Sequence, residues 1–309
     1  TLFRSAVQTF LIGIGAVIGS WLPYILHNWL DVSNEASEGS VALNTQLAFY
    51  IGAAVFLASI LWTVLKTREY PPTEYEKYHG KASHEHSGLG SVFTDFARMP
   101  RTMKQLGLVQ FFSWFALFGM WVFTTDAIAT HIYHLPITDK SSVAYHDAQD
   151  WTGVIFGVYN FISAIYALCL PVIAKKIGRK KTHALSLLIG GVGLISFFFA
   201  PNKEFLVFSM ACVGIAWASI LAMPYVILSS SIPAGKMGIY MGIFNFFITI
   251  PQIINGLFGG PIVSGIFGKQ AMDYVVVGGV CMLIGAVVTM IFVKSEDFDT
   301  QKGIKGKRA

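Results

Sequence analysis

The chain has 309 residues, of which 54% are hydrophobic and only 13% are charged, with a mean hydropathy of +0.59. Soluble proteins carry about 25% charged residues, so this composition excludes an ordinary soluble domain. A formal net charge of +5 raises the question of nucleic-acid binding, but that function needs a basic face on a folded soluble domain. Cys169, Cys212 and Cys281 lie within apolar runs, where small core residues are expected, and they say nothing about the redox compartment.

Several apolar runs are long enough to cross a hydrocarbon core of ~30 Å, which needs about 20 helical residues. The predicted spans, in chain order, are 6–29, 43–65, 106–130, 151–174, 184–201, 204–228, 237–260 and 273–293. A helix is expected for each, because an open strand would leave backbone groups unpaired in lipid. The sequence therefore predicts an all-α, polytopic bundle with eight membrane spans.

The positive charges predict the orientation of these spans. All but three of the 22 Lys and Arg residues fall on the side of the membrane that carries the N-terminus, the exceptions being Lys140, Lys203 and Lys269. The positive-inside rule places the cation-rich side in the cytoplasm. We therefore expect a multi-pass protein of the cell (inner) membrane, with both ends of this chain cytoplasmic and with no nucleic-acid partner.

The longest polar stretch, residues 66–105, is expected to be a cytoplasmic linker between two bundles. Residues 1–65 would then be the last two helices of an N-terminal bundle, 106–293 a C-terminal six-helix bundle and 294–309 a cytoplasmic tail. The chain enters a span almost at once and without an initiator Met, so we expect further helices upstream, four in a symmetric protein. The linker contains a cluster that suggests a metal site, but its Gly/Ser/Lys-rich surroundings favour a solvated segment; the cluster is His79, His84, Glu85 and His86. We expect no metal and no cofactor.

A short basic segment joins the fourth and fifth predicted spans. Gly178 permits a tight reversal there, and the lysines beside it can reach anionic headgroups. One interpretation is a simple positive-inside anchor. The other is a gating turn, because Lys176, Gly178, Arg179 and Lys180 resemble a cytoplasmic loop pattern of the major facilitator superfamily, from which the leading acidic residue is absent here.

Further motifs, in their order and spacing, resemble one branch of that superfamily. They are Arg4–Gly15 with Leu22-Pro23-Tyr24, Trp114 through Thr125-Asp126 to Tyr133, Trp151–Val154, and Lys236–Asn245 with Pro251-Gln252. Together they are similar to the glycoside–pentoside–hexuronide:cation symporters, and in particular to plant sucrose transporters and bacterial maltose/sucrose proton symporters. The resemblance implies a twelve-helix fold, of which this chain holds the fifth to twelfth helices. It also implies proton-coupled symport of a disaccharide or glycoside by alternating access.

Sixteen of the 17 acidic residues fall in loops or at the ends of predicted spans, and Asp126 alone lies in the interior of one. A carboxylate in a membrane helix costs a few kcal/mol, about 2.5–3.5 on insertion scales, unless it faces water, a partner or a proton. This suits a proton-coupling group, and the resemblance supports that role, because Asp126 aligns with the second Asp of an Asp-Thr-Asp stretch in the plant proteins. Thr124 replaces the first Asp of that stretch. The alternative is an outer-interface Asp in contact with water, since His131 and His134 follow within two turns.

Neutral polar and aromatic residues within the spans are the candidates for a sugar site, since amides donate to and accept from hydroxyls and an indole can stack on a sugar ring. The candidates are Gln110, Trp114, Tyr159, Asn160, Asn245 and Gln252. Asn245 and Gln252 share one helix face with Gly238, Gly242 and Gly256. Gln110 and Asp126 differ by about 160° around a straight helix, so both cannot face one cavity. For each candidate, a hydrogen bond between helices is the alternative interpretation.

The expected partners are therefore a small sugar, a proton and the lipid bilayer, for a protein that works as a monomer. A sodium-coupled sugar carrier and a non-transporting sensor derived from a carrier are the alternatives. A membrane-embedded enzyme would need converging catalytic acids, bases or metal ligands, and a single carboxylate within the spans argues against it. We expect no enzymatic activity.

Overall fold

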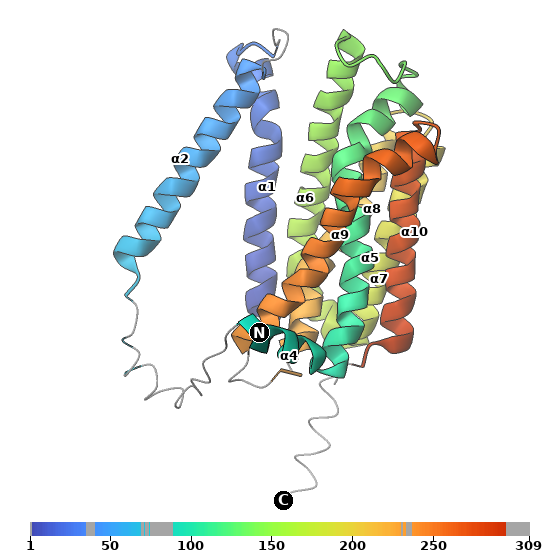
Figure 1. Cartoon of the computed structure of the whole chain (residues 1–309). Helices are drawn as coiled ribbons and strands as arrows, with labels where there is room; N and C mark the ends of the chain where they lie inside the picture. The colour runs from blue at the N-terminus through green and yellow to red at the C-terminus, as the bar shows by residue number, and fades with distance from the viewer. Residues whose placement is uncertain are drawn as a thin grey trace, which may run out of the picture. The chain divides into compact units, whose positions relative to one another are not determined.

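The computed structural model describes residues 2–34, 41–68, 71, 74, 89–229, 231–232 and 237–294, and the regular structure in these ranges is helical (Figure 1). Before the polar linker lie α1 (Leu2–Leu30) and α2 (Leu43–Lys66), and at its end lies the short α4 (Leu89–Ala97). The helices that follow are α5 (Arg101–Ala127), the π-helical turn η1 (Ile128–Ile132), α6 (Val143–Ile177), α7 (Arg179–Ser196), the 3₁₀ turn η2 (Phe197–Phe199), α8 (Phe205–Ser229), α9 (Met237–Gly265) and α10 (Ala271–Phe292). The all-α fold class is thereby confirmed.

Within the described residues, 8 helices are long and apolar enough to cross a membrane, and each overlaps one of the predicted spans. Their bounds differ most at the fourth span, which was expected at 151–174 and extends from Val143 to Ile177. The early start has a local cause: the Ser142 hydroxyl accepts a hydrogen bond from the Tyr145 backbone N–H at 3.2 Å, as an N-cap does. Hydropathy alone could not detect this polar first turn.

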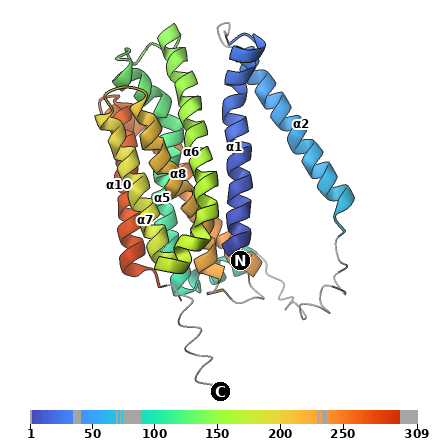
Figure 2. The ribbon, with the colours of Figure 1, turned by 180° about the vertical axis from the view of Figure 1, so that it is seen from behind.

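The chain divides into two compact units, one comprising Thr1–Val17 with Thr94–Ala309 and the other comprising Ile18–Phe93. In the second unit, the Asn44 side-chain amide of α2 donates to the Pro23 carbonyl of α1 at 3.3 Å, which joins the two helices near their connecting segment (Figure 2). The domain boundaries drawn from the sequence, including the linker at 66–105, stay predictions. The described residues do not include the linker cluster that suggests a metal site, nor the predicted tail beyond Lys294.

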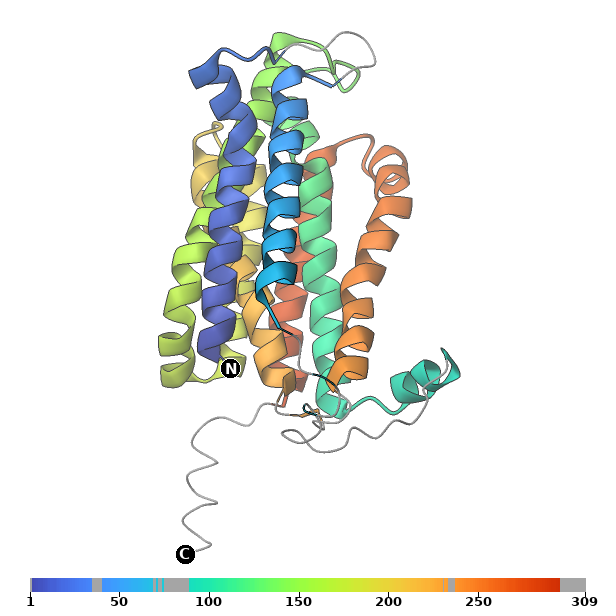
Figure 3. The same ribbon diagram turned by 90° about the vertical axis from the view of Figure 1, so that its left-hand side faces the viewer.

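In the first unit, α5 to α10 pack as a helical bundle. The main contacts join α5 to α9 and α10, α7 to α8 and α10, and α6 to α8, so α9 lies at an edge beside α5 (Figure 3). The α7–α10 contact depends on two facing glycines: a Cβ added to Gly191 would lie 2.9 Å from the Gly279 carbonyl oxygen, and one added to Gly279 would lie 2.9 Å from the Gly191 oxygen. Small residues allow this close approach between helices in a membrane.

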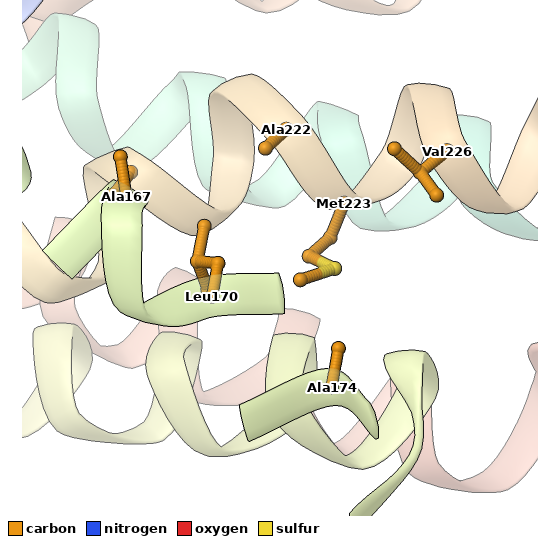
Figure 4. Close-up of a cluster of buried hydrophobic side chains, with 7 residues drawn as sticks. Ala167, Leu170, Ala174, Ala222, Met223 and Val226 are labelled. Atoms are coloured by element: carbon orange, nitrogen blue, oxygen red, sulfur yellow. The ribbon is translucent and has the colours of Figure 1, made fainter. Parts of the chain in front are cut away.

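The α6–α8 contact is filled by small and flexible side chains. Ala167, Leu170 and Ala174 of α6 pack against Ala222, Met223 and Val226 of α8, and all are at most 2% exposed (Figure 4). Alanine brings the backbones close, and the unbranched Met223 fills the gap that remains. This core lies next to the end of α6 and therefore fixes the position of the basic turn.

The basic turn is shorter than the expected loop at 175–183. A single residue, Gly178, separates α6 from α7, with φ of 88° and ψ of 151°, a conformation that is essentially confined to glycine. Its N–H donates to the Ala174 carbonyl at 3.0 Å, and its carbonyl accepts from the Thr182 hydroxyl at 2.8 Å. The tight reversal at Gly178 is therefore confirmed, and the surrounding predicted loop is helical.

Candidate functional site

Gln110 and Trp114 lie one turn apart on the face of α5 that is directed into the bundle. Gln110 is 0% exposed, and neither its amide nitrogen nor its amide oxygen has a hydrogen-bond partner among the described residues. The Trp114 indole nitrogen is also buried and likewise lacks a partner within these ranges. Buried polar groups are hydrogen-bonded in the large majority of cases, so these donors and acceptors without partners are unusual.

An indole cluster lies beside them. Trp217 of α8 lies edge-on to Trp114 and to Trp121, with ring centroids 5.6 Å away in both cases, and Trp114 and Trp121 are 6.1 Å apart. Sequence reasoning did not select Trp217. It lies in an almost uniformly apolar helix, where no periodicity distinguishes a residue that faces a site from one that packs in the core.

Tyr159 of α6 is hydrogen-bonded to the indole cluster. Its hydroxyl accepts a hydrogen bond from the Trp121 indole N–H at 3.2 Å, and the residue is 6% exposed. The adjacent Asn160 is also buried, and its amide donates to the Phe156 carbonyl of its own helix at 2.9 Å. The structure therefore gathers Trp114 and Tyr159 around one indole cluster, with Gln110 one turn away on α5 and Asn160 next to Tyr159 on α6.

The two α9 candidates have different surroundings. Asn245 is exposed and Gln252 is half-buried, and neither side chain forms a hydrogen bond with another described residue. A Cβ added to Gly238, Gly242 or Gly256 on the same face would meet nothing within 4 Å. This α9 face is therefore not packed within the described part of the bundle, and the structure does not bring it into the indole cluster.

Asn255, which the sequence analysis did not select, forms the best-connected polar group of α9. It is 2% exposed, its amide donates to the Phe115 carbonyl of α5 at 3.1 Å, and its oxygen accepts from the Tyr274 hydroxyl of α10 at 2.7 Å. An amide within an apolar span was a signal that could have identified it. Since its donor and acceptor bonds join three helices, it holds the bundle together.

Asp126 lies at the other end of α5, one residue before its last residue. Its carboxylate accepts hydrogen bonds from the Lys140 ammonium and from the Tyr145 hydroxyl, the latter at 3.0 Å, and the ion pair is 51% exposed at Lys140 and 37% at Asp126. Burial acts to lower the pKa of Lys140, but the hydrogen bond and charge of Asp126 outweigh it, so this pKa lies above its ordinary value. Asp126 is therefore paired and partly solvated, and Gln110 belongs to a different site.

A cavity of about 280 Å³ opens beside this ion pair. Its wall includes residues of α5, α6 and α9, of the connecting segment and of the segment before α10, namely Phe123, Asp126, Pro136, Ile137, Asp139, Lys140, Tyr145, Val263 and Lys269. After Ala127 the helix widens into η1, where the Tyr133 N–H donates to the carbonyl of Ile128, five residues back, at 3.1 Å. This wider turn redirects the chain so that Lys140 returns to Asp126.

His183, near the start of α7, is 0% exposed, and its Nδ1 lies 2.9 Å from the Ser219 hydroxyl oxygen of α8. By contrast, Lys176 is exposed and Lys180 is half-buried. The turn is thus fixed to α8 from within and presents its lysines outward. Among the described residues, no group of three or more His, Cys, Asp or Glu could hold a metal ion.

The sequence model of the Major Facilitator Superfamily matches residues 3–255 and, in a second alignment, residues 146–308. The chain belongs to the Major Facilitator Superfamily. It is accordingly a multi-pass membrane protein of a transporter family, not an enzyme, and the expected superfamily is confirmed.

Curated relatives within the superfamily are distant. Sucrose transport protein SUT5 of Oryza sativa is 24% identical over 314 residues, covering 89% of this chain and 57% of the relative. Solute carrier family 45 member 3 of Mus musculus is 24% identical, covering 72% of this chain and 43% of the relative. Proton-associated sugar transporter A of Homo sapiens is 20% identical, covering 66% of this chain and 29% of the relative. The chain spans about half the length of the curated relatives it matches, and the expected similarity to plant sucrose transporters is confirmed.

Proposed function

We propose that this protein is a proton-coupled secondary transporter that moves a disaccharide or related glycoside by alternating access. The observation that carries the proposal is the pair of unpartnered polar groups, the Gln110 amide and the Trp114 indole N–H, beside an aromatic cluster within the bundle. An amide can donate to and accept from neighbouring sugar hydroxyls, and an indole edge or face can contact the apolar side of the ring. The sugar transporters among the relatives support this substrate class.

In this proposal Tyr159 and Asn160 complete the sugar site from α6. The unpacked face of α9 supports a second role, because Asn245 and Gln252 have no hydrogen-bond partner among the described residues and are available to a sugar. Asp126 is the proposed proton-coupling group. The turn of Lys176, Gly178, Arg179 and Lys180 is proposed to stabilise one conformation at the cytoplasmic surface.

The proposal also includes the wider organisation. Helices α5 to α10 would form the C-terminal half of the carrier, α1 and α2 the last helices of its N-terminal half, and residues 66–105 a cytoplasmic linker. The carrier would be a monomer of the cell membrane. Both ends of this chain would lie in the cytoplasm, because the predicted loops on that side carry nearly all the cations.

The deciding experiment is uptake of labelled maltose, sucrose and glucose by the full-length protein in vesicles. An imposed pH gradient should drive accumulation of at least one disaccharide. Accumulation that follows a sodium gradient instead would favour the sodium-coupled alternative, and saturable binding without flux would favour the sensor. Failure of every sugar to bind or move would overturn the proposed substrate class.

Gln110→Ala tests the site itself, and Gln105→Ala is the matched control on the same helix. Gln105 is half-buried, and its side-chain oxygen accepts a hydrogen bond from the Lys294 backbone N–H at 3.2 Å, away from the indole cluster. Sugar affinity should fall in the first variant and stay unchanged in the second. Equal losses in both variants would contradict the assignment of Gln110 to the sugar site.

A further inference from the structure

Ser163 of α6 is a buried serine whose hydroxyl has no hydrogen-bond partner among the described residues. Serine hydroxyls within helices ordinarily donate to a carbonyl three or four residues back along the same helix. Ser113 of α5 does so, with its hydroxyl 2.6 Å from the Val109 carbonyl oxygen. Ser186 of α7 does so as well, at 2.8 Å from the Thr182 oxygen. Because Ser163 is 0% exposed, bulk water cannot supply the missing bond.

The packing of α6 explains why Ser163 differs from these two serines. The carbonyl four residues back belongs to Tyr159, and a Cβ added to Gly214 of α8 would lie only 2.4 Å from its oxygen. The carbonyl three residues back belongs to Asn160, and a Cβ added to Gly13 of α1 would lie 3.0 Å from its oxygen. The backbones of two neighbouring helices thus lie against both oxygens, since glycine has no side chain to keep them apart. The two usual acceptors of a helical serine are covered by other helices at this position.

Ser163 lies at the level of the indole cluster. On α6, Tyr159, Ser163 and Ala167 follow one another at steps of four residues and therefore share one face. The glycine of α8 that meets the Tyr159 carbonyl lies three residues before Trp217, and Ala218, the residue after Trp217, belongs to the same buried cluster as Ala167. Ser163 and Trp217 thus lie between the same two contacts of α6 with α8.

The unpartnered groups of α5 lie on the other side of Trp217. The ring of Trp217 is 5.6 Å from that of Trp114, whose indole N–H has no partner among the described residues, and Gln110 follows one turn away. The hydrogen bonds that join α5 to α6 at Trp121 and Thr125 lie nearer the end of α5. A sugar held between Gln110, Trp114 and α6 would join the two helices at a second level.

We infer that Ser163 is a sugar-binding residue, whose hydroxyl pairs with one hydroxyl of the disaccharide while Gln110 and Trp114 hold the sugar from α5. The inference rests on the proposed function and extends the sugar site to a further residue of α6. A serine hydroxyl both donates and accepts hydrogen bonds, as a sugar hydroxyl does. In the sugar-free protein the buried hydroxyl is desolvated without compensation, and binding of the sugar removes this cost.

Equilibrium binding to the full-length protein tests the inference, with maltose, sucrose and their monodeoxy analogues as probes. Ser163→Ala should weaken binding of the preferred disaccharide by about three- to tenfold, the effect of one lost hydrogen bond. One monodeoxy analogue, which lacks the hydroxyl that Ser163 contacts, should bind equally well to the unmodified protein and to Ser163→Ala. A purely structural effect would instead weaken binding of the parent sugar and of every analogue alike.

Ser113→Ala is the matched control, because it also removes a fully buried serine hydroxyl, but one that has an acceptor within its own helix. Sugar affinity should be unchanged in this variant. Without sugar, its melting temperature should fall because a hydrogen bond is lost, whereas that of Ser163→Ala should stay the same or rise because an unpartnered group is removed. A marked fall in Ser163→Ala would show that its hydroxyl is paired in the sugar-free protein and would overturn the inference.

Equal affinity of the unmodified protein and Ser163→Ala for the preferred disaccharide would also reject the role of Ser163. The proposed function would stand in that case, provided that Gln110→Ala still binds the sugar more weakly. Losses of the same size for every analogue would reject the role of Ser163 as well. If the unmodified protein binds neither disaccharide, the proposed substrate class fails and the inference fails with it.

Discussion

The two polar regions of α5 differ in how deeply the side chain is buried and in whether it has hydrogen-bond partners. Gln110 is completely buried and its amide has no hydrogen-bond partner among the described residues, whereas Asp126 is partly exposed and has both a cation and a hydroxyl as partners. A buried group without partners costs folding free energy and is retained for a reason other than stability. A solvated ion pair contributes little and is easily broken. The first region is thus suited to bind a ligand and the second to change its partner.

The largest expected effect comes from Gln110→Leu, which replaces the amide by an apolar side chain of similar size. Sugar binding should fall by about 10- to 100-fold, because two or so hydrogen bonds are lost at about 0.5–1.5 kcal/mol each. The same change should raise the free energy of unfolding by about 1–3 kcal/mol, the cost of an unsatisfied buried polar group. Equilibrium binding and thermal melting measure the two effects. Loss of stability together with unchanged binding would show that Gln110 is a structural residue.

Asp126→Asn should have the next largest effect, on coupling alone. Accumulation driven by a pH gradient should be abolished, because the amide cannot take up and release a proton, while exchange of labelled for unlabelled sugar should be partly retained. Stability should change by less than about 1 kcal/mol, since the ion pair is partly exposed. Asp139→Asn is the control from the same cavity and should accumulate sugar normally. Unchanged accumulation in Asp126→Asn would remove this residue from the coupling mechanism.

Trp121→Phe tests the link between the indole cluster and α6. The change removes the hydrogen bond from the indole N–H to the Tyr159 hydroxyl, and it leaves that hydroxyl without this donor. We expect a loss of about 1 kcal/mol in stability and a few-fold weaker sugar binding. Calorimetry and binding titrations check both. A variant with unchanged affinity would show that Tyr159 is positioned by packing alone.

The smallest expected effect concerns Asp139, whose pKa is lowered by hydrogen bonds from Ser142 and, more weakly, from Ser141. A carboxyl group with a lowered pKa in the folded state stabilises that state above its unfolded pKa, near 3.8, and this contribution is lost as the pH falls through the folded pKa. Asp139→Asn should therefore reduce the acid-induced fall in melting temperature slightly. Melting curves from pH 2 to pH 6 measure the difference, and a steeper fall would contradict the assignment.

Much of the membrane architecture could be predicted from local sequence properties. Length and hydropathy identified each span, because a lipid core requires about 20 apolar residues per helix. Gly178 indicated the reversal between α6 and α7, since few other residues adopt its positive φ. The order of several motifs identified the superfamily. The helix ends were less accurate, because the Ser142 cap is polar and lies beyond the apolar run.

The grouping of side chains was decided by the tertiary structure. Gln110 and Asn255 are both amides within apolar spans, and the helices that pack beside each decide that Asn255 has partners while Gln110 has none among the described residues. Trp217 was missed for a related reason, because an almost uniformly apolar helix does not reveal which of its residues face its neighbours. The single intramembrane carboxylate was evident from the sequence, but its ion pair with Lys140 required the wide turn of η1 that returns the chain to α5. Hydropathy can be read from one segment of the sequence, whereas a hydrogen bond or ion pair between segments depends on which segments pack together.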